Sequence, residues 1–382
     1  MMDRCDDAIA ATGTLAPATR ERIVDSIPAD LEAEWGLLVD NASEPNAFAE
    51  PWFVAASLAH LREEPVRLIE VRRAGRLIGL FMAGVEPSYD RVPFAHVQNW
   101  RHHHHFLGTP LIASGEEGAF WEALLAHLDA APWAANFLHL VGLVEDGPVL
   151  AALRAAGRPC PVVYREVRAT LASDLQPDAY YEHNVRKKKR KELARLRNRI
   201  AELGEVTTAE LTNAADLDSW CDDFLALERS GWKGENGSAL GCTEATEQFF
   251  RAAVSGAQRS GRLQFLRLAV AGKPVAMLVN FLTPPGSFSF KTAYDESYGR
   301  FSPGVLLQRA NLDILGRPDI AWMDSCAAPD HPMIDSLWAE RRTVVRVTVP
   351  LAGTRRRLAY NTARLLEESS ALCRRLARRV RG

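Results

Sequence analysis

Three things are scarce in this chain of 382 residues: cysteine, net charge and long hydrophobic runs. Its six cysteines are scattered and none forms a Cys-x-x-Cys pair, so the sequence indicates neither a zinc ribbon nor a disulfide scaffold. The 46 basic residues nearly balance the 48 acidic ones, and the net charge is -2. Any affinity for nucleic acid or membranes must therefore come from local patches. The chain has no uninterrupted apolar run of about 18 residues, which argues against a membrane-spanning helix.

The N-terminus also lacks the features of a targeting signal. It carries Asp3, Asp6 and Asp7 instead of a basic segment followed by an apolar run. We therefore expect a cytoplasmic protein whose thiols are reduced. Residues 1–28 show no clear hydrophobic period and are predicted to be a poorly ordered lead-in. The length of the chain suggests two domains or lobes.

An internal repeat supports two lobes. Residues 66–82 and 263–279 each read as two apolar strands joined by an Ala-Gly-basic turn, with Gly75 and Gly272 lying 197 positions apart. Each segment predicts a β-hairpin. In both halves the predicted order is helix, three strands, helix, strand, helix, strand. The alternative is two unrelated hairpins that share a common turn. We predict an N-terminal lobe at 29–172, a C-terminal lobe at 173–350 and a basic amphipathic helix at 351–382.

The duplicated order of elements resembles the GNAT acyltransferase fold in tandem. That arrangement is similar to Fem-type aminoacyltransferases and to the related CelD/BcsL-like (BioF2-like) acetyltransferases. The second half carries the more specific likeness, in the segments LERSGWK (227–233), KTAYDE (291–296) and SPGVLL (302–307). The resemblance spans roughly residues 30–350. It implies an α/β (α+β) fold of two GNAT-like lobes, each a mixed, mostly antiparallel sheet flanked by helices.

The donor site is predicted at the start of a helix near residue 303. Ser302 and Pro303 suit the N-cap and the first helical position, and the free N–H groups there, with Arg300, suit a pyrophosphate. GNAT enzymes hold the coenzyme A pyrophosphate at this place. The resemblance thus implies that acetyl-CoA or another acyl-CoA is bound by Arg300, Ser302, Gly304 and Val305. Compared with the usual GNAT loop, however, Gly304 comes late, and Pro303 removes one N–H donor. The alternative to a donor site is therefore an ordinary capped helix.

The matching loop of the first half, residues 99–113, has no capped glycine turn leading into a helix. We therefore expect the first lobe not to bind the donor. The loop contains four consecutive histidines, His102 to His105, of which at most two could converge on one metal ion in an extended chain. We predict no metal. A polar loop, an acceptor-site wall formed by His103 and His105, and a general base with a pKa near neutrality all stay open.

Acyl transfer to an amine needs a base, a polarised carbonyl and a stabilised leaving thiolate. Asp295 and Glu296 follow the strand beside the donor loop and are predicted to deprotonate or hold the amine. Tyr294 is predicted to hydrogen-bond the thiolate or the acceptor, and Lys291 lies on the same strand. The alternative is that the two carboxylates are turn residues and that Lys291 is a surface ion-pair partner.

The glycine-rich segment 231–241 is predicted to form a mobile lid, in which Trp232 and Lys233 line the acceptor site. Asp324, His331 and Glu228 are weaker candidates for the same cleft.

Two basic segments provide the local patches. Residues 186–199 hold nine basic residues and one acid, and the tail 354–382 holds nine arginines and two acids. Both are predicted to be amphipathic helices. Arg186 to Arg199 could contact tRNA, an anionic membrane or the donor phosphates, and the tail could lie on a membrane surface. A solvated helix face and a helix packed on its lobe are the respective alternatives.

These features together predict an acyltransferase that moves an acyl group, most simply acetyl, from acyl-CoA to an amine. The acceptor would be a sugar, a lipid or another envelope or exopolysaccharide precursor, which would favour a location in the cytoplasm or peripheral to the inner membrane. Two alternatives are kept: a Fem-like aminoacyl-tRNA-dependent transferase, and a non-catalytic adaptor that retains only the duplicated fold.

Overall fold

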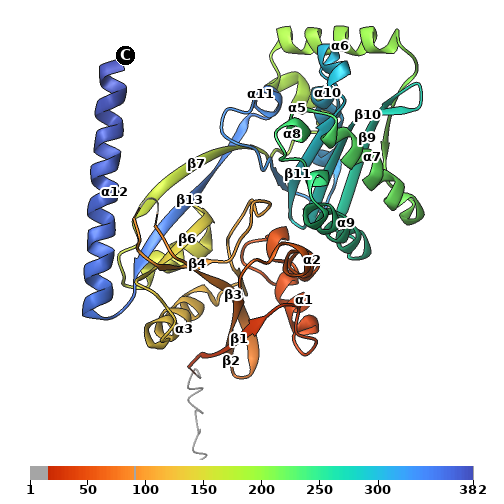
Figure 1. Cartoon of the computed structure of the whole chain (residues 1–382). Helices are drawn as coiled ribbons and strands as arrows, with labels where there is room; N and C mark the ends of the chain where they lie inside the picture. Colours follow the sequence, from red (N-terminus) through yellow and green to blue (C-terminus); the bar gives the residue numbers. More distant parts are fainter. Residues whose placement is uncertain (1–15, 90–91, 382) are drawn as a thin grey trace, which may run out of the picture.

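The computed structural model describes residues 16–89 and 92–381. Among these residues the strands form one mixed sheet with the order β1-β2-β3-β4-β6-β13-β7-β12-β11-β10-β9-β8, and β5 pairs with β3. Figure 1 shows the first half of the chain in red to yellow and the second half in green to blue, with helices packed against each part of the sheet.

The first half contains β1 (Ala18–Val24), α1 (Glu32–Asp40), α2 (Pro51–Leu61), β2 (Val66–Arg73), β3 (Arg76–Glu86), β4 (His96–Asn99), β5 (Leu111–Ile112), α3 (Glu117–Ala130), β6 (Phe137–Val144), α4 (Pro148–Ala155) and β7 (Val162–Leu171). The second half contains α5 (Pro177–Asn184), α6 (Lys187–Ala201), β8 (Val206–Glu210), α7 (Leu217–Arg229), α8 (Trp232–Glu235), α9 (Glu244–Arg259), β9 (Leu263–Val270), β10 (Lys273–Thr283), β11 (Gly286–Tyr294), α10 (Pro303–Ala310), β12 (Trp322–Asp324), α11 (Pro332–Asp335) and β13 (Glu340–Pro350), and α12 (Thr354–Arg381) ends the chain.

The two repeated hairpins have the same turn and the same register. Ala74 and Gly75 have φ of 50° and 78°, and Ala271 and Gly272 have φ of 49° and 79°. Positive φ at both central residues is typical of the type I′ turn, which matches the twist of a hairpin. Each hairpin also has one bulged residue at the same distance from its turn, Ile78 in β3 and Val275 in β10. The predicted mixed α/β architecture of two similar halves is confirmed.

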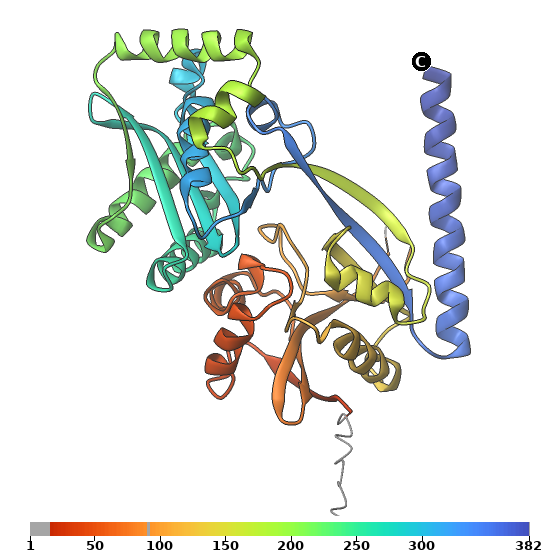
Figure 2. The same ribbon diagram turned by 180° about the vertical axis from the view of Figure 1, so that it is seen from behind.

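The last strands of the two halves are exchanged. β7 and β13 pair with each other, but β13 also pairs with β6 of the first half, and β7 pairs with β12 of the second. Figure 2 shows these two strands running together from one half to the other. Each half thus needs a strand from the other half to complete its sheet. A division of the chain at residue 172 therefore does not separate two closed sheets.

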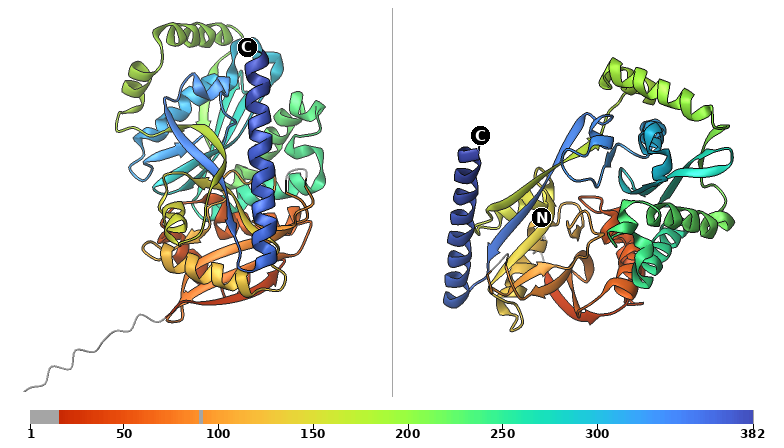
Figure 3. Two further views of the ribbon diagram at one scale, coloured as in Figure 1. Left: turned by 90° about the vertical axis from the view of Figure 1, so that its left-hand side faces the viewer. Right: turned by 45° about the horizontal axis from the view of Figure 1, so that its top comes forward.

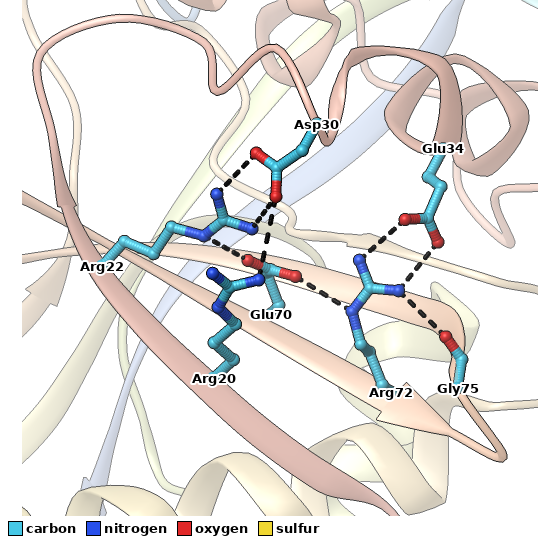
Figure 4. Close-up of polar contacts among 7 residues, drawn as sticks. All are labelled: Arg20, Arg22, Asp30, Glu34, Glu70, Arg72 and Gly75. Atoms are coloured by element: carbon cyan, nitrogen blue, oxygen red, sulfur yellow. Dashed lines mark hydrogen bonds and ion pairs between the residues drawn. The ribbon is translucent and has the colours of Figure 1, made fainter.

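The predicted lead-in is wrong for residues 16–28, because β1 lies there and pairs with β2. Figure 4 shows how β1 is held: Arg22 Nε donates to Glu70 Oε1 (2.7 Å), and Arg72 Nε donates to Glu70 Oε2 (2.9 Å). The Glu70 side chain is fully buried, and Arg22 also pairs with Asp30 (2.7 Å). The strand was missed because its contacts are made by charged side chains and not by an apolar pattern. Residues 1–15 lie outside the described part.

The predicted C-terminal helix is present as α12, which stands beside the sheet of the first half (Figure 3, left). Its first turns are docked: Tyr360 packs on Phe137 with ring centroids 6.2 Å apart, and Arg356 Nη1 donates to Asp129 O (2.8 Å). Leu358 is 68% exposed on the same helix. Side chains beyond Glu368 lie outside the description, so the amphipathic face predicted for the tail is described only in part. Nowhere in the described residues is a helix both long and apolar enough to cross a bilayer.

Candidate functional site

A small cleft in the second half lies beside the C-terminal end of β11. β11 pairs with β12 only over Gly286–Phe288. From there β11 continues to Tyr294, and no described strand pairs with it on that side. β11, α7 and α8 lie close together in Figure 1. The side chains and backbone that line the cleft come from these elements and from the turn that follows β11: Leu227, Glu228, Gly231, Lys233, Thr292, Ala293, Tyr294 and Glu296.

A β-bulge in β11 sets the direction of Lys291. Val279 pairs with Lys291 and Asn280 with Ser289, which leaves Phe290 as the extra residue. The bulge breaks the alternation of the strand, so that Phe290 and Lys291 approach the same neighbour, Phe106 of the first half. Lys291 Nζ lies 5.5 Å from the ring centroid of Phe106 and 5.8 Å from that of Phe290. Bulges frequently re-aim side chains beside active sites.

The electrostatic surroundings of Lys291 are unusual for a lysine. Burial and, to a smaller extent, the like charge of Lys233 together lower the pKa of Lys291 to about 8, against the opposing effect of Glu228. Desolvation and a nearby cation both disfavour the charged form of an amine. Lys291 is thus poised to change its charge close to physiological pH, which is a property of many functional lysines.

Lys233 is held by a buried carboxylate. Its Nζ donates to Glu228 Oε1 (2.8 Å) and to Thr292 O on β11 (3.3 Å). Glu228 is 3% exposed, and its other oxygen accepts from the backbone N–H of Leu240 (2.8 Å). The segment predicted to be a mobile lid therefore contains the short helix α8 and is held to α7 through Glu228 at both of its ends.

Two imidazoles complete the surroundings of the two lysines. His104 is 5% exposed and stacks on Phe249 with centroids 5.4 Å apart. Burial, reinforced by the charge of Lys291, lowers the pKa of His104 to about 2, so this ring is neutral at any physiological pH. Burial likewise lowers the pKa of His331, and Lys233 adds to that effect. Within the described residues, Nδ1 of each ring has no hydrogen-bond partner.

Arg168, on β7, connects the segment around Phe106 in the first half with Asp324 on β12. Arg168 Nη1 donates to Phe106 O (2.5 Å) and lies 4.0 Å from Asp324 Oδ1, and its Nε donates to Glu166 Oε1 (2.5 Å). Asp324 is fully buried, and its Oδ1 also accepts from the N–H of Cys326 (2.8 Å). Cys326 has φ of 54°, an uncommon backbone conformation for a residue with a Cβ. Backbone strain of this kind often occurs at functional sites.

The equivalent place in the first half is closed. β4 and β6 pair only over two residues. Beyond them, the side chain of Asn99 donates to Val141 O (2.9 Å) and accepts from Val141 N–H (2.9 Å). Gly108 N–H donates to Gly142 O (2.8 Å), and a Cβ on Gly108 would overlap with Val141 O. A side chain and a loop of the protein thus bridge β4 and β6 beyond their paired residues, which favours our expectation that the first lobe does not hold the donor.

The structure gives Asp295 a structural role instead of the predicted catalytic one. Its Oδ1 accepts from Ser297 N–H (3.0 Å), and its Oδ2 accepts from Lys273 Nζ (2.9 Å). Burial acts to raise the pKa of Asp295, but the hydrogen bonds from Ser297 and Lys273 outweigh burial and lower that pKa. A weakly basic carboxylate that caps a turn is poorly suited to take a proton from an amine. Tyr294 and Glu296, in contrast, line the cleft, and their catalytic roles stay predictions.

The predicted donor loop differs from an open phosphate site. Ser302 does not cap α10, because its backbone is left-handed (φ 52°, ψ 53°). Gly304 is covered by Met333, since a Cβ on Gly304 would lie 2.8 Å from Met333 Cε. Val305 is buried, and Arg300 is exposed with its guanidinium 4.7 Å from the ring of Phe301. Of the four predicted residues, only Arg300 presents a charge to solvent here. Helix α6 contacts the adjoining turn, Glu296–Phe301.

The predicted acceptor residues are distributed differently from the expectation. His103 is exposed, whereas His105 is 6% exposed and packs among Phe53, Trp100 and other rings of the core. The predicted place of His105 in a wall of the acceptor site is therefore corrected. His104, and not His105, is the histidine of this run whose surroundings include Lys291 and Lys233. The side chain of Trp232 lies outside the described residues. No group of three or more potential metal ligands occurs among the residues that are described.

Sequence reasoning missed Phe106 and Arg168 and did not select His104. The available signals were an arginine inside an otherwise apolar strand end (RATL, 168–171) and an aromatic residue directly after the histidine run. Neither signal identifies a site until the strand exchange brings β7 beside β12.

The sequence of the second half and the fold of the whole chain resemble those of known proteins. Residues 187–330 match the sequence family described as the acetyltransferase (GNAT) domain. No curated protein matches the chain by sequence. Among solved structures, FemX has 12% identity and a TM-score of 0.55 over 91% of this chain and 100% of its own. The C-terminal domain of a putative lysylphosphatidylglycerol synthetase from Agrobacterium fabrum has 12% identity and a TM-score of 0.56 over 90% of this chain and 96% of its own. A protein of unknown function from Bacteroides thetaiotaomicron VPI-5482 has 11% identity and a TM-score of 0.54, covering 83% and 97%. The second half thus carries a GNAT domain, and the whole chain shares the fold of these proteins.

Proposed function

We propose that this protein is an N-acyltransferase that takes an acyl group from an acyl-CoA bound along β11, beside the cleft lined by β11, α7 and α8. The observation that carries the proposal is Lys291, a partly charged amine at an open strand edge inside the GNAT domain. The thioester arm of the donor would lie along the unpaired edge of β11. The opposite wall would come from the first half, through Phe106 and His104.

The reaction follows from the groups around the cleft. The nitrogen of the acceptor amine attacks the thioester carbon, the new C–N bond forms, and the C–S bond breaks. Protonated Lys291 stabilises the oxygen that becomes negative in the transition state. The amine must lose one proton, and Glu296, which lines the cleft, is proposed to accept it. The leaving thiolate takes up a proton from the solvent or from Tyr294.

The acceptor is proposed to be an amine of a sugar, a lipid or another envelope precursor, handled in the cytoplasm or at the inner membrane surface. Acyl-CoA dependence is tested by titrating acetyl-CoA and longer acyl-CoAs while following the melting temperature. A ligand that binds only the folded state raises that temperature. Release of free coenzyme A thiol after adding a set of amino sugars and amino lipids then reports transfer. If no acyl-CoA raises the melting temperature at millimolar concentration, the proposal is wrong, and a non-catalytic adaptor becomes the better description.

A second candidate function is transfer from aminoacyl-tRNA, which the exposed basic face of α6 favours. Leu193, Leu196 and Ile200 are buried on one side of this helix. Its opposite side exposes seven cations: Arg186, Lys187, Lys188, Lys191, Arg195, Arg197 and Arg199. Such a face can contact the phosphates of a nucleic acid, but these contacts do not recognise its bases.

Changing Lys187, Lys188, Lys189 and Arg190 to Gln separates the two donors. With tRNA as the donor, affinity should fall steeply, and the slope of log affinity against log salt should flatten by roughly 0.7 to 0.9 for each lost contact. With an acyl-CoA as the donor, affinity should change only a few-fold, because a single coenzyme A can reach few of these charges. Calorimetric titration of both ligands at two salt concentrations gives the answer. Parent protein that binds no tRNA at low salt eliminates the second candidate.

A further inference from the structure

A small polar pocket lies beside the two exchanged strands, β7 and β13, which Figure 2 shows running together. Its walls come from these strands, from β6 and from the loop that contains the histidine run. The pocket has a volume of about 50 Å³. One buried water molecule needs roughly 10–15 Å³ on this measure, so the pocket has room for a few waters or for one group of the size of a phosphate.

Arginines dominate the charge of this pocket. Its ionisable lining consists of Arg101, Arg168 and Arg346, one carboxylate, Glu166, and Tyr164. Arg346 on β13 pairs with Tyr164 on β7, and Tyr164, Glu166 and Arg168 alternate along β7. Alternate residues of a strand and directly paired residues share one face of a sheet. The strand exchange therefore brings these four side chains to one face, and the loop adds Arg101.

The two more buried arginines of the pocket keep free hydrogen-bond donors. Arg168 is 7% exposed; its Nε and Nη1 donate to Glu166 and to Phe106 O, and its Nη2 has no hydrogen-bond partner among the described residues. Arg101 Nη2 donates to His105 O (2.9 Å), whereas Nε and Nη1 of Arg101 have no such partner. All three of these unbonded nitrogens remain in contact with solvent. They are donors that the fold holds in place and that a ligand in the pocket can use.

Arg346 lies at the mouth of the pocket. It is exposed, its guanidinium lies 4.8 Å from the centroid of the Tyr164 ring, and Tyr164 is 47% exposed. Within the part of the chain that the structure describes, no carboxylate oxygen comes within 4.0 Å of a guanidinium nitrogen of Arg346 or Arg101. A guanidinium that stacks on a ring keeps the N–H groups of its edge for another partner. The pocket therefore opens to solvent beside two groups that can contact a ligand.

The positive charge of the pocket is undercompensated. Burial and, to a smaller extent, the charges of Arg346 and Arg168 together lower the pKa of Arg101 to about 10, against the opposing effect of Glu166. Three guanidiniums thus share one carboxylate on the pocket wall. A phosphate monoester carries about −1.5 to −2 charges at pH 7, and its oxygens fit the paired N–H groups of arginine. It therefore balances the excess charge better than a carboxylate, which carries a single charge.

We infer that this pocket binds the phosphoryl group of a small phosphomonoester, with Arg101 and Arg168 on its inner side and Arg346 at its mouth. The inference does not depend on the identity of the acyl donor. The rest of the ligand extends past Tyr164 into solvent, because the pocket has room for the phosphoryl group alone. Phe106 also lines the pocket, and its ring lies 5.5 Å from Lys291 Nζ, so the bound ligand adjoins the proposed reaction centre.

Three sugars of matched shape test the charge requirement: glucose 6-phosphate, a dianion; glucuronate, a monoanion; and glucose, which is neutral. Calorimetric titration of the full-length protein should show saturable binding of glucose 6-phosphate. Glucuronate and glucose should bind roughly ten-fold more weakly or worse, because they lose charge-assisted hydrogen bonds. Equal or preferential binding of glucuronate or glucose, or no binding of glucose 6-phosphate at millimolar concentration, overturns the proposal.

Two variants locate the site. Arg346→Gln removes an exposed guanidinium and should weaken glucose 6-phosphate binding roughly ten-fold without lowering the melting temperature. Arg101→Gln should weaken binding at least as much, and the Arg346 variant keeps the test valid if Arg101→Gln does not fold. Arg165→Gln is the matched control, because Arg165 is also an exposed arginine of this sheet but does not line the pocket. Parent-like binding in both site variants contradicts the assignment.

Glu166 provides a test with the opposite sign. It is the carboxylate of the pocket lining, and its Oε1 accepts from Arg168 Nε (2.5 Å). A bound phosphate competes with this carboxylate and is repelled by it. Glu166→Gln should therefore tighten the binding of glucose 6-phosphate several-fold, whereas the loss of a merely structural contact would weaken it. Weaker binding in Glu166→Gln is the result that the charge argument does not survive.

The acyl donor must be distinguished from the ligand of this pocket, because coenzyme A itself carries a phosphomonoester. Saturating acetyl-CoA should leave the affinity for glucose 6-phosphate unchanged. Competition between the two would assign the pocket to the phosphate of the donor. That result would overturn a separate ligand site but would leave the proposed acyl transfer intact.

The phosphoryl group could belong to a soluble molecule or to a lipid, and vesicles distinguish these sources. Co-sedimentation with phosphatidylcholine vesicles only when they contain phosphatidic acid, abolished by Arg346→Gln, assigns the pocket to a lipid phosphate. Binding of glucose 6-phosphate without co-sedimentation assigns it to a soluble phosphomonoester. Vesicle binding that Arg346→Gln does not change, together with no binding of glucose 6-phosphate, overturns the proposal.

Discussion

Replacing Lys291 by methionine is expected to lower kcat/KM for acyl transfer about 10²- to 10³-fold. Methionine preserves the length and packing of the side chain but cannot stabilise negative charge on the thioester oxygen. Removing one such stabilising group from a preorganised site typically costs this much. The melting temperature should not fall, because the lysine is an amine whose burial already disfavours its charge. Stopped-time assays of thiol release at several acyl-CoA concentrations measure the effect.

The pH profile gives the same prediction a second test. The pKa of Lys291 is lowered to about 8, so raising the pH through 8 removes its charge. If the charged form is the active one, the rate should decline on the alkaline side near pH 8. A Lys291→Arg variant should retain more activity than the methionine variant and should lose that decline, because arginine stays charged. Lys273→Met is the matched control, since Lys273 is exposed and pairs with the turn residue Asp295. An activity that is unchanged in Lys291→Met excludes this residue from the chemistry.

Replacing Arg168 by methionine is expected to reduce the free energy of unfolding by about 4 kcal/mol. The guanidinium is nearly buried, and its removal leaves the fully buried Asp324 with one fewer cation and Phe106 O without its donor. Breaking a buried ion pair by removing one partner typically costs this much, because the remaining charge stays buried. Unfolding by urea, followed by tryptophan fluorescence, measures the loss.

The matched control for Arg168 lies on the same strand. Arg165 pairs with Glu145 (2.8 Å) but is 57% exposed, so an Arg165→Met variant should change stability little. Arg168 also holds the first-half loop to β12. Its loss should therefore weaken acyl-CoA binding as well as stability. Equal stability of the two variants would mean that the junction between the halves is held by other contacts.

The duplicated architecture could be predicted because its signals are local. The Ala-Gly-basic turns at Gly75 and Gly272 fix the hairpin type within four residues, and the apolar runs beside them fix the strands. The GNAT-like motifs around Lys291 and Pro303 have the same local character. Of the residues selected from the sequence, Lys233, Tyr294 and Glu296 line the cleft, and their roles stay predictions.

What could not be predicted depends on contacts between distant segments. The exchange of β7 and β13 joins residues about 180 positions apart, and no local pattern indicates it. The bulge at Phe290 breaks the alternation of β11 and brings Phe290 and Lys291 beside the same neighbour, Phe106, which no local pattern indicates. In the histidine run, His104 lies near the lysines and His105 lies in the core. The conformation of the loop decides this difference, and the composition of the run does not indicate it.

The most direct test of the account is the hydrogen-exchange footprint of a bound acyl-CoA. If the donor lies along the open edge of β11, saturating acetyl-CoA should slow amide exchange in residues 289–305 and around Leu240. Residues 96–109 of the first half, where Asn99 and Gly108 close the equivalent space, should exchange at an unchanged rate. Protection confined to 96–109, or no protection in 289–305 at saturation, would contradict the placement of the donor in the second half.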